Sequence, residues 1–125
     1  MTARLLLQLA AVFGGLGVAI GAFGAHALHD TLVKAGRLDT FETAVRYQFF
    51  HVLALLAIGA LWASRPELRS LGTTGWLWLG GIVVFSGSLY GICFTGITKL
   101  GAVAPIGGLL FLAGWLSLVL AVREL

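Results

Sequence analysis

The stretch GAFGAHALHDTLVKAGRLDTFETAVRYQFFH, from Gly21 to His51, contains all three histidines of the chain. On either side lie long runs of glycine, alanine, leucine and valine with almost no charge. A helix crosses the hydrocarbon core of a bilayer with about 20 predominantly apolar residues. The change from apolar to polar and back within this stretch therefore predicts the end of one membrane span, a polar connection from Leu28 to Asp39, and the start of a second span.

The composition of the whole chain supports a membrane protein. Of its 125 residues, 59% are hydrophobic and 10% are charged, and the mean hydropathy is +1.01. A soluble domain of this length needs more charge to cover its surface, and it cannot hide so much apolar side chain in one core. The net charge of +3 comes from scattered Lys and Arg at the ends of the apolar runs, so it does not indicate a nucleic-acid partner.

Four apolar runs are long enough to span a bilayer. We expect a single all-α domain over residues 1–125, with four transmembrane helices in an antiparallel bundle at about residues 5–25, 40–63, 75–94 and 101–122. The first run is too long for the apolar part of a signal peptide and has no clear cleavage region, so we expect it to be retained. The bilayer is then the first partner of the chain.

The start of the second span has a helix-capping pattern. Asp39 and Glu42 have the spacing of a capping box, which predicts Asp39 as the N-cap of a helix beginning near Thr40. This helix is about 36 Å long at 1.5 Å per residue, about one turn more than the hydrocarbon requires. Counting back 20 residues from Trp62 places Arg46 just inside the hydrocarbon.

Aromatic and basic residues bear on the position of the chain in the membrane. Four spans bring Trp62, Trp76, Trp78 and Trp115 towards one face, as expected of interfacial tryptophans, and Tyr47 and Tyr90 towards the other. The side of the termini carries Arg4, Arg65, Arg69 and Arg123, and the opposite side carries Lys34, Arg37, Arg46 and Lys99. The positive-inside rule favours cytoplasmic termini if Arg46 is counted as buried in the membrane.

Small residues recur at helical spacing in two of the spans. The first span carries Gly14, Gly17, Gly21 and Gly24 at steps of three and four, and the third carries Gly87 and Gly91. Close backbone approach through small residues is a common means of helix association in lipid. We therefore predict that these glycines are helix-packing positions, with Gly17 at an interface.

Five side chains near the polar connection form a candidate polar cluster: His26, Glu42, Arg46, Tyr47 and His51. Glu42 and Arg46 stand four residues apart in the favourable order for an ion pair along a helix. This pair either anchors the helix at the interface or belongs to a functional pocket inside the bundle, since ionisable residues in membranes are often functional. We predict that Arg46 points into the bundle, with Glu42 as its first acceptor, because an unpaired guanidinium in lipid is costly. Tyr47 and His51 are rotated by about 100–140° from that pair, so one pocket requires neighbours on both sides.

The residues present give little support to cofactor or catalytic chemistry. His26 and His51, with Glu42 as a third ligand, would make only a weak metal site, because no cysteine lies nearby. The same two histidines could in principle ligate haem, but the sequence has no haem-attachment motif. Cys93 is the only cysteine, so no disulfide framework is expected. Ser86, Ser88 and Thr95 lack a base at a recognisable spacing. We expect no metal, no cofactor and no catalytic residue.

Three blocks of sequence carry a family resemblance: GAFGAHALHD at residues 21–30, TFETAVRYQFFHVLALL at 40–56, and FSGSLYGICFTGITKLGAVAPIGGLLFLAGW at 85–115. Together they resemble the YgdD-like family of small bacterial inner-membrane proteins, which has mitochondrial relatives in animals. The resemblance implies four membrane helices, a multi-pass protein of the inner (plasma) membrane, and no established activity or catalytic residue.

Two classes of function are compatible with these features. The first is a non-catalytic membrane subunit or assembly factor that packs through its glycine-rich helix faces against itself or a membrane-protein partner. The second is a small transporter or channel that uses the polar cluster around Glu42, Arg46 and His51. A single four-helix bundle leaves only a narrow path for a soluble substrate, so the second class requires a homo-oligomer.

Overall fold

The chain folds into a bundle of long helices. The structure, a computed structural model, describes residues 1–125 with the exception of the side chain of Glu124. The elements are α1 (Ala3–Ala25), α2 (His29–Lys34), α3 (Leu38–Ser64), α4 (Leu71–Gly81), the π-helix η1 (Ile82–Ser86), α5 (Gly87–Thr95), the 3-10 helix η2 (Thr98–Ala102), α6 (Ala104–Ala121) and the 3-10 helix η3 (Val122–Glu124).

Four helical stretches are long and apolar enough to cross a membrane: Ala3–Ala25, Leu38–Ser64, Leu71–Thr95 and Thr98–Ala121. The third is α4, η1 and α5 in continuous succession, and the fourth is η2 followed by α6. The prediction of an all-α protein with four transmembrane helices is therefore confirmed.

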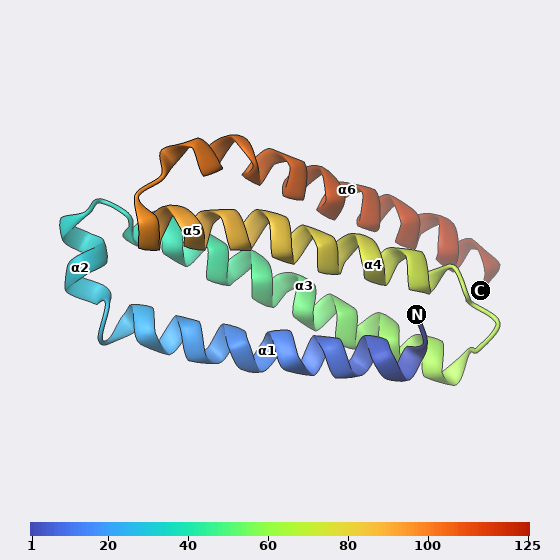
Figure 1. Cartoon of the computed structure of the whole chain (residues 1–125). Coiled ribbons are helices and arrows are strands. Elements are labelled where there is room, and N and C mark those ends of the chain that lie inside the picture. Colours follow the sequence, from blue (N-terminus) through green and yellow to red (C-terminus); the bar gives the residue numbers. More distant parts are fainter.

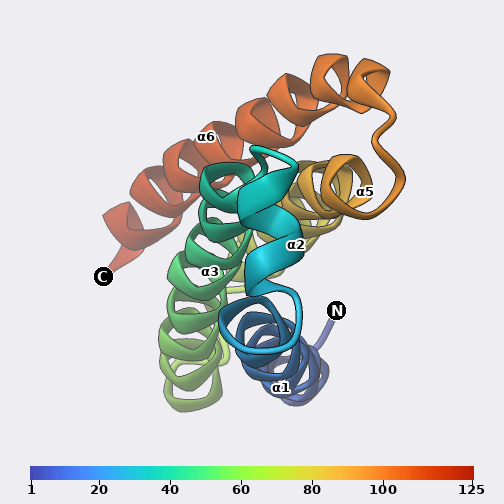
Figure 2. The same ribbon diagram turned by 90° about the vertical axis from the view of Figure 1, so that its left-hand side faces the viewer.

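The long helices lie side by side, and both termini are at the end of the bundle opposite α2 (Figure 1). The main packed pairs are α1 with α3, and α4 with α6. Seen from the α2 end, α1 and α6 lie on opposite sides of the bundle, with α3 and the α4–α5 span between them (Figure 2). The inner helices α3 and α4 thus have neighbours on two sides, and α1 and α6 leave one long face free.

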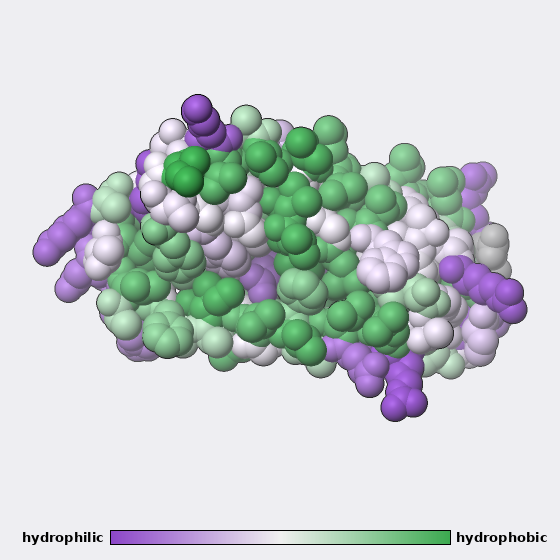
Figure 3. All heavy atoms as spheres, viewed as in Figure 1, coloured by the Kyte–Doolittle hydropathy of each residue, from purple (hydrophilic) through white to green (hydrophobic). Residues whose placement is uncertain are grey.

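The outer surface is apolar where a membrane would surround it. On the face shown in Figure 3, hydrophobic side chains form a broad region across the middle, and hydrophilic ones gather towards the two ends. Large apolar side chains of the outer helices are well exposed, among them Val18 (62%), Leu109 (66%) and Leu112 (67%). Water would penalise such a surface, whereas lipid solvates it, which agrees with four spanning helices.

The second span begins differently from the capping prediction. Helix α3 begins at Leu38, its N-cap is Arg37, and no side chain caps it. Asp39 lies inside the first helical turn, so its prediction as the N-cap is wrong. An acidic side chain in the first turn still interacts favourably with the helix dipole. The segment Asp39–Thr43 is helical, and α3 measures about 40 Å, roughly 10 Å more than the hydrocarbon thickness.

The third span contains a π-helical turn from Ile82 to Ser86, which the sequence analysis did not predict. Such turns insert one extra residue per turn and often occur at functional sites. Here the turn lies where α6 crosses closely, since a Cβ on Gly107 would overlap the backbone nitrogen of Phe85. On its other side, Ser86 Oγ donates a hydrogen bond to the carbonyl of Ala44 at 2.7 Å. The π turn therefore contacts both α3 and α6.

The glycines of α1 face α3. A Cβ on Gly17 would lie 3.0 Å from the Phe49 ring and 3.1 Å from the Gln48 amide, and one on Gly24 would overlap the ring of Phe41. Gly14 and Gly21 lie less tightly, at 3.3 Å from Val52 and 3.4 Å from Val45. This glycine stripe is therefore occupied within the chain by α3.

The glycines of α5 differ from the prediction. Among the residues that the structure describes, none lies within 4 Å of a Cβ placed on Gly87, so Gly87 is not a packing position between helices of the same chain. Gly91 faces Leu100 of η2 rather than a long helix. The close approach of the third and fourth spans is made by other glycines, Gly81 against Phe111 and Gly114 against Trp78.

The tryptophans divide between surface and core. Trp76 and Trp115 are 54% and 45% exposed, whereas Trp78 is fully buried. The Trp78 indole N–H donates to the carbonyl of Phe111 at 3.3 Å. Trp78 is therefore a packing residue between α4 and α6, and not an interfacial anchor as the sequence analysis expected.

Candidate functional site

The five residues of the predicted polar cluster are distributed over three separate hollows. Glu42 and Arg46 line a hollow between the end of α1, α2 and the start of α3. Tyr47 and His51 line a groove on the side of α3 that faces α6. His26, at the C-cap of α1, is exposed and lies beside a third hollow on the outside of that helix. The structure therefore does not bring the five together.

The ion pair predicted between Glu42 and Arg46 is not formed. Both side chains are exposed, and the ion pairs of the described residues are His29–Asp30 and Arg65–Glu67. The expectation that Arg46 points into the bundle towards protein acceptors is therefore wrong. The physical reason is its position near the start of an over-long helix, where an arginine can extend its head group to the polar boundary and an exposed pair stabilises little.

His51 is the buried titratable residue of the groove, with 4% of its side chain exposed. Its Nδ1 lies 2.8 Å from the carbonyl oxygen of Tyr47, and its Nε2 lies 3.2 Å from Nε1 of Trp115. An indole N–H can only donate, so Nε2 is the acceptor and the proton resides on Nδ1, which donates to Tyr47. The geometry therefore fits a neutral imidazole in one tautomer, with both nitrogens hydrogen-bonded.

Aromatic rings surround this imidazole. The Phe111 ring stacks on it with centroids 3.6 Å apart and planes 6° from parallel, and the Trp115 ring lies at 6.0 Å. The Tyr47 ring packs at 4.8 Å from that of Phe85, in the π turn. Side chains from α3, η1 and α6 thus build one wall of rings around His51.

These rings line a lateral groove of about 550 Å³ between α3 and α6, which we call the His51 groove. Its lining residues are Tyr47, His51, Phe85, Pro105, Gly108, Leu109, Phe111, Leu112 and Trp115. Helix α6 packs chiefly on α4 and η1 and reaches α3 here through Phe111 and Trp115. The groove therefore opens sideways, at the depth of the membrane.

Gln48, which was not among the residues predicted from the sequence, joins three spans. Its side chain is 2% exposed, its amide nitrogen donates to the carbonyl of Phe13 in α1 at 2.7 Å, and its amide oxygen accepts from the Tyr90 hydroxyl of α5 at 2.7 Å. The signal was present in the sequence, because a polar amide within an apolar span is expected to hydrogen-bond across helices.

Further hydrogen bonds between polar side chains join helices in the interior of the bundle. Thr74 and Ser117 hydroxyls are 2.8 Å apart and join α4 to α6. Among the described residues, no buried side-chain nitrogen or oxygen lacks a hydrogen-bond partner. Polar side chains inside the bundle are thus hydrogen-bonded to backbone carbonyls, as Ser86 is to Ala44, or to other side chains, as Thr74 is to Ser117.

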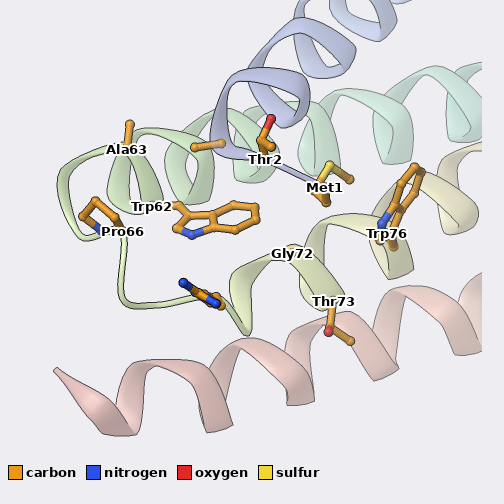
Figure 4. A pocket seen from close by; sticks show the side chains of 10 residues that line it. Met1, Thr2, Trp62, Ala63, Pro66, Gly72, Thr73 and Trp76 are labelled. Atoms are coloured by element: carbon orange, nitrogen blue, oxygen red, sulfur yellow. The ribbon is translucent and has the colours of Figure 1, made fainter.

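A further hollow, of about 650 Å³, lies at the end of the bundle that holds the termini. Figure 4 shows Met1 between the indoles of Trp62 and Trp76, with Gly72 beside them and Pro66 at the edge. Among the residues that the structure describes, no group of three or more His, Cys, Asp and Glu is placed to hold a metal ion. Thr2, Arg69 and Thr73 also line this hollow, so it combines apolar contact with polar side chains at the membrane boundary.

Comparison with known proteins agrees with this architecture. Residues 20–108 match the family model described as a protein of unknown function (DUF423). The UPF0382 membrane protein SSP2132 of Staphylococcus saprophyticus is 44% identical over 117 residues, which are 94% of this chain and 95% of the relative. YwdK of Bacillus subtilis, also a UPF0382 membrane protein, is 38% identical over 118 residues, or 94% and 95% of the two chains.

The UPF0382 inner membrane protein YgdD of Escherichia coli is 41% identical over 124 residues, which are 98% of this chain and 93% of the relative. No solved structure matches the chain. The resemblance drawn from the three sequence blocks is confirmed, as is a multi-pass location in the bacterial inner (plasma) membrane. The chain belongs to the DUF423 family of membrane proteins of unknown function.

Proposed function

We propose that the protein is a non-catalytic membrane subunit or assembly factor, and that a transmembrane helix of its partner binds in the His51 groove. The observation that supports this most is that no described helix of this chain fills the groove between α3 and α6. His51 is buried beneath the Phe111 ring, but Tyr47, Leu109 and Leu112 in the groove wall stay 39%, 66% and 67% exposed. The α1 glycine stripe is already occupied by α3, so a partner requires another surface.

The shape of the groove suits a helix. It extends along α6 from Pro105 to Trp115, a distance of about 15 Å or nearly three helical turns. Gly108 lies in its wall with nothing within 4 Å of a Cβ placed there, and small residues let two helix backbones approach closely in lipid. Aromatic side chains are enriched at the centres of protein interfaces, which fits the rings around His51.

The transporter or channel class receives less support. Its candidate site needs Glu42, Arg46 and His51 on one path, and these residues line two different hollows. The buried polar side chains hold helices together through hydrogen bonds such as that between Gln48 and Tyr90. A path through the bundle axis would require these bonds to break, at a cost in each transport cycle.

Site-specific photo-crosslinking in the native membrane tests the proposal. A photoreactive amino acid at Leu112, which lines the groove and is 67% exposed, is compared with one at Val18, a similarly exposed residue of α1. We expect a discrete crosslinked protein from Leu112 alone, identified by mass spectrometry as another membrane protein or as a second copy of this chain.

Two outcomes contradict the proposal. In the first, Leu112 and Val18 give the same products, or crosslink only to lipid, so that the groove is ordinary lipid-facing surface. In the second, the purified protein alone carries out solute or proton flux in liposomes, and the flux is lost when His51 is replaced by alanine. That result would assign the groove to the transporter class.

A further inference from the structure

The hollow that contains Arg46 is separate from the His51 groove and has its own chemistry. It encloses about 370 Å³ between α1, α2 and α3. Gly21, Val45 and Phe41 supply apolar walls, and Glu42 and Arg46 supply a carboxylate and a guanidinium. The imidazole of His29, from α2, also lines it. We call it the Arg46 pocket. An apolar cavity with one charge of each sign is the kind of site that an amphiphilic zwitterion fits.

The depth of Arg46 in the membrane sets what it can meet. Its Cα lies about 12 Å from the start of α3, and the hydrocarbon covers about 30 Å of the 40 Å helix. The Arg46 side chain is exposed, and it makes no ion pair with a described residue. A flexible stem carries its guanidinium to the boundary of the hydrocarbon. The acceptors abundant at that depth are lipid phosphates.

The two charges are arranged as a complementary pair for one head group. Residues 42 and 46 are one turn apart on α3, about 6 Å along the axis, and both face the same pocket. A guanidinium binds a phosphate with two parallel hydrogen bonds, and a carboxylate accepts hydrogen bonds from an ammonium. The short two-carbon link of a phosphoethanolamine group places a phosphate and an ammonium at a comparable separation.

We propose that the Arg46 pocket binds a glycerophospholipid with a phosphoethanolamine head group. Arg46 holds the phosphate, Glu42 holds the ammonium, and the start of an acyl chain lies against Gly21 and Val45. A phosphoglycerol head group fits less well because it carries the same phosphate charge without an ammonium, so Glu42 repels the uncompensated charge and has no ammonium to bind. A trimethylammonium head group fits less well because it has no N–H to donate.

The test uses the full-length protein, purified in mild detergent and stripped of lipid. Short-chain phosphatidylethanolamine, phosphatidylglycerol and phosphatidylcholine are added separately, and binding is measured by native mass spectrometry and by the rise in Tm. We expect phosphatidylethanolamine to bind most tightly. Arg46→Gln weakens its binding by about tenfold or more, since a hydrogen-bonded charge pair is lost. Arg46→Lys recovers only part of that loss.

Two further variants separate the roles of the charges. Glu42→Gln removes the preference for phosphatidylethanolamine over phosphatidylglycerol, because the repulsion and the ammonium acceptor disappear together. Arg69→Gln, an exposed arginine at the opposite end of the bundle, leaves binding unchanged. All three positions are exposed, so the folded state tolerates these changes.

Four results overturn the proposal. Equal binding of all three lipids, or unchanged binding in Arg46→Gln, removes the head-group assignment. Inorganic phosphate that protects the protein as well as the lipid does would make the pocket a free-anion site. An unchanged lipid preference in Glu42→Gln would show that the carboxylate does not contact the head group.

Discussion

Replacing Gln48 by leucine tests whether one buried amide holds three spans together. The substitution keeps the approximate volume of the side chain and removes two hydrogen bonds, one to the Phe13 carbonyl and one from the Tyr90 hydroxyl. Hydrogen bonds between membrane helices contribute about 0.6 kcal/mol on average and about 1.7 kcal/mol at most. We therefore expect Gln48→Leu to lower the free energy of unfolding by about 1–3 kcal/mol.

The assay is reversible unfolding in mixed micelles with increasing SDS, followed by far-UV circular dichroism. Gln8→Leu is the matched control, because Gln8 is exposed on α1 and its loss should leave stability unchanged or slightly higher. Tyr90→Phe completes a double-mutant cycle with Gln48→Leu, and we expect a coupling energy of about 0.6–1.7 kcal/mol. A coupling energy near zero, with Gln48→Leu as stable as the native protein, would refute the role of this residue.

Two other changes have defined outcomes. Gly107→Ala should destabilise the bundle strongly in the same SDS titration, because the new Cβ meets the rigid backbone of Phe85. Gly108→Ala should be nearly neutral, because the space around its Cβ is open. Equal effects of the two changes on stability would contradict the close crossing of α6 over the π turn. In the loop after α3, the hydrogen bond from Arg65 holds the pKa of the Glu67 carboxyl below its usual range. The contact between Arg65 and Glu67 therefore makes a small contribution to stability at pH values above the pKa of Glu67 in the unfolded chain. This contribution is lost as the pH falls through the pKa of Glu67 in the folded protein. An NMR titration should show the Glu67 pKa rising towards its ordinary value in Arg65→Gln, and an unchanged pKa would contradict the contact.

The number of spans could be predicted because membrane helices are specified by simple length and composition. Charged or helix-breaking residues separate each apolar run from the next, so the four runs could be recognised in the sequence without knowledge of tertiary contacts. The start of α3 was less accurate, since Asp39 has the right residue type for a cap but Arg37 occupies that position. A capping pattern identifies the region of a helix end better than the individual residue.

The arrangement of the polar cluster could not be predicted from the sequence. Helical periodicity predicts which residues share one face of a helix, but it does not predict which other helix packs against that face. The rotation of Tyr47 and His51 away from Glu42 and Arg46 was correctly anticipated, but whether one pocket or two would receive them depends on how α1 and α6 are placed around α3. The structure places those helices on opposite sides, so the two sets of residues line separate hollows.

Gln48 was overlooked for a different reason. Its amide is uncharged, and lies between Tyr47 and His51, so the high cost of an unpaired charge in lipid, which singles out Glu42 and Arg46, does not single out Gln48. The π turn at Ile82–Ser86 had no comparable signal. Its residues are ordinary apolar side chains followed by one serine, and the extra residue in the turn is visible only once α6 is in place.

The central claim is that the His51 groove receives a partner, and filling the groove tests this most directly. Gly108→Leu places a bulky side chain in the groove, and Gly15→Leu places the same side chain on α1; neither new Cβ has a neighbour within 4 Å. Each variant is purified from native membranes in mild detergent, and its mass and co-purifying proteins are compared with those of the native protein. We predict that Gly108→Leu loses the partner while its stability in SDS is unchanged, and that Gly15→Leu retains it. Retention of the same complex by Gly108→Leu would contradict the account.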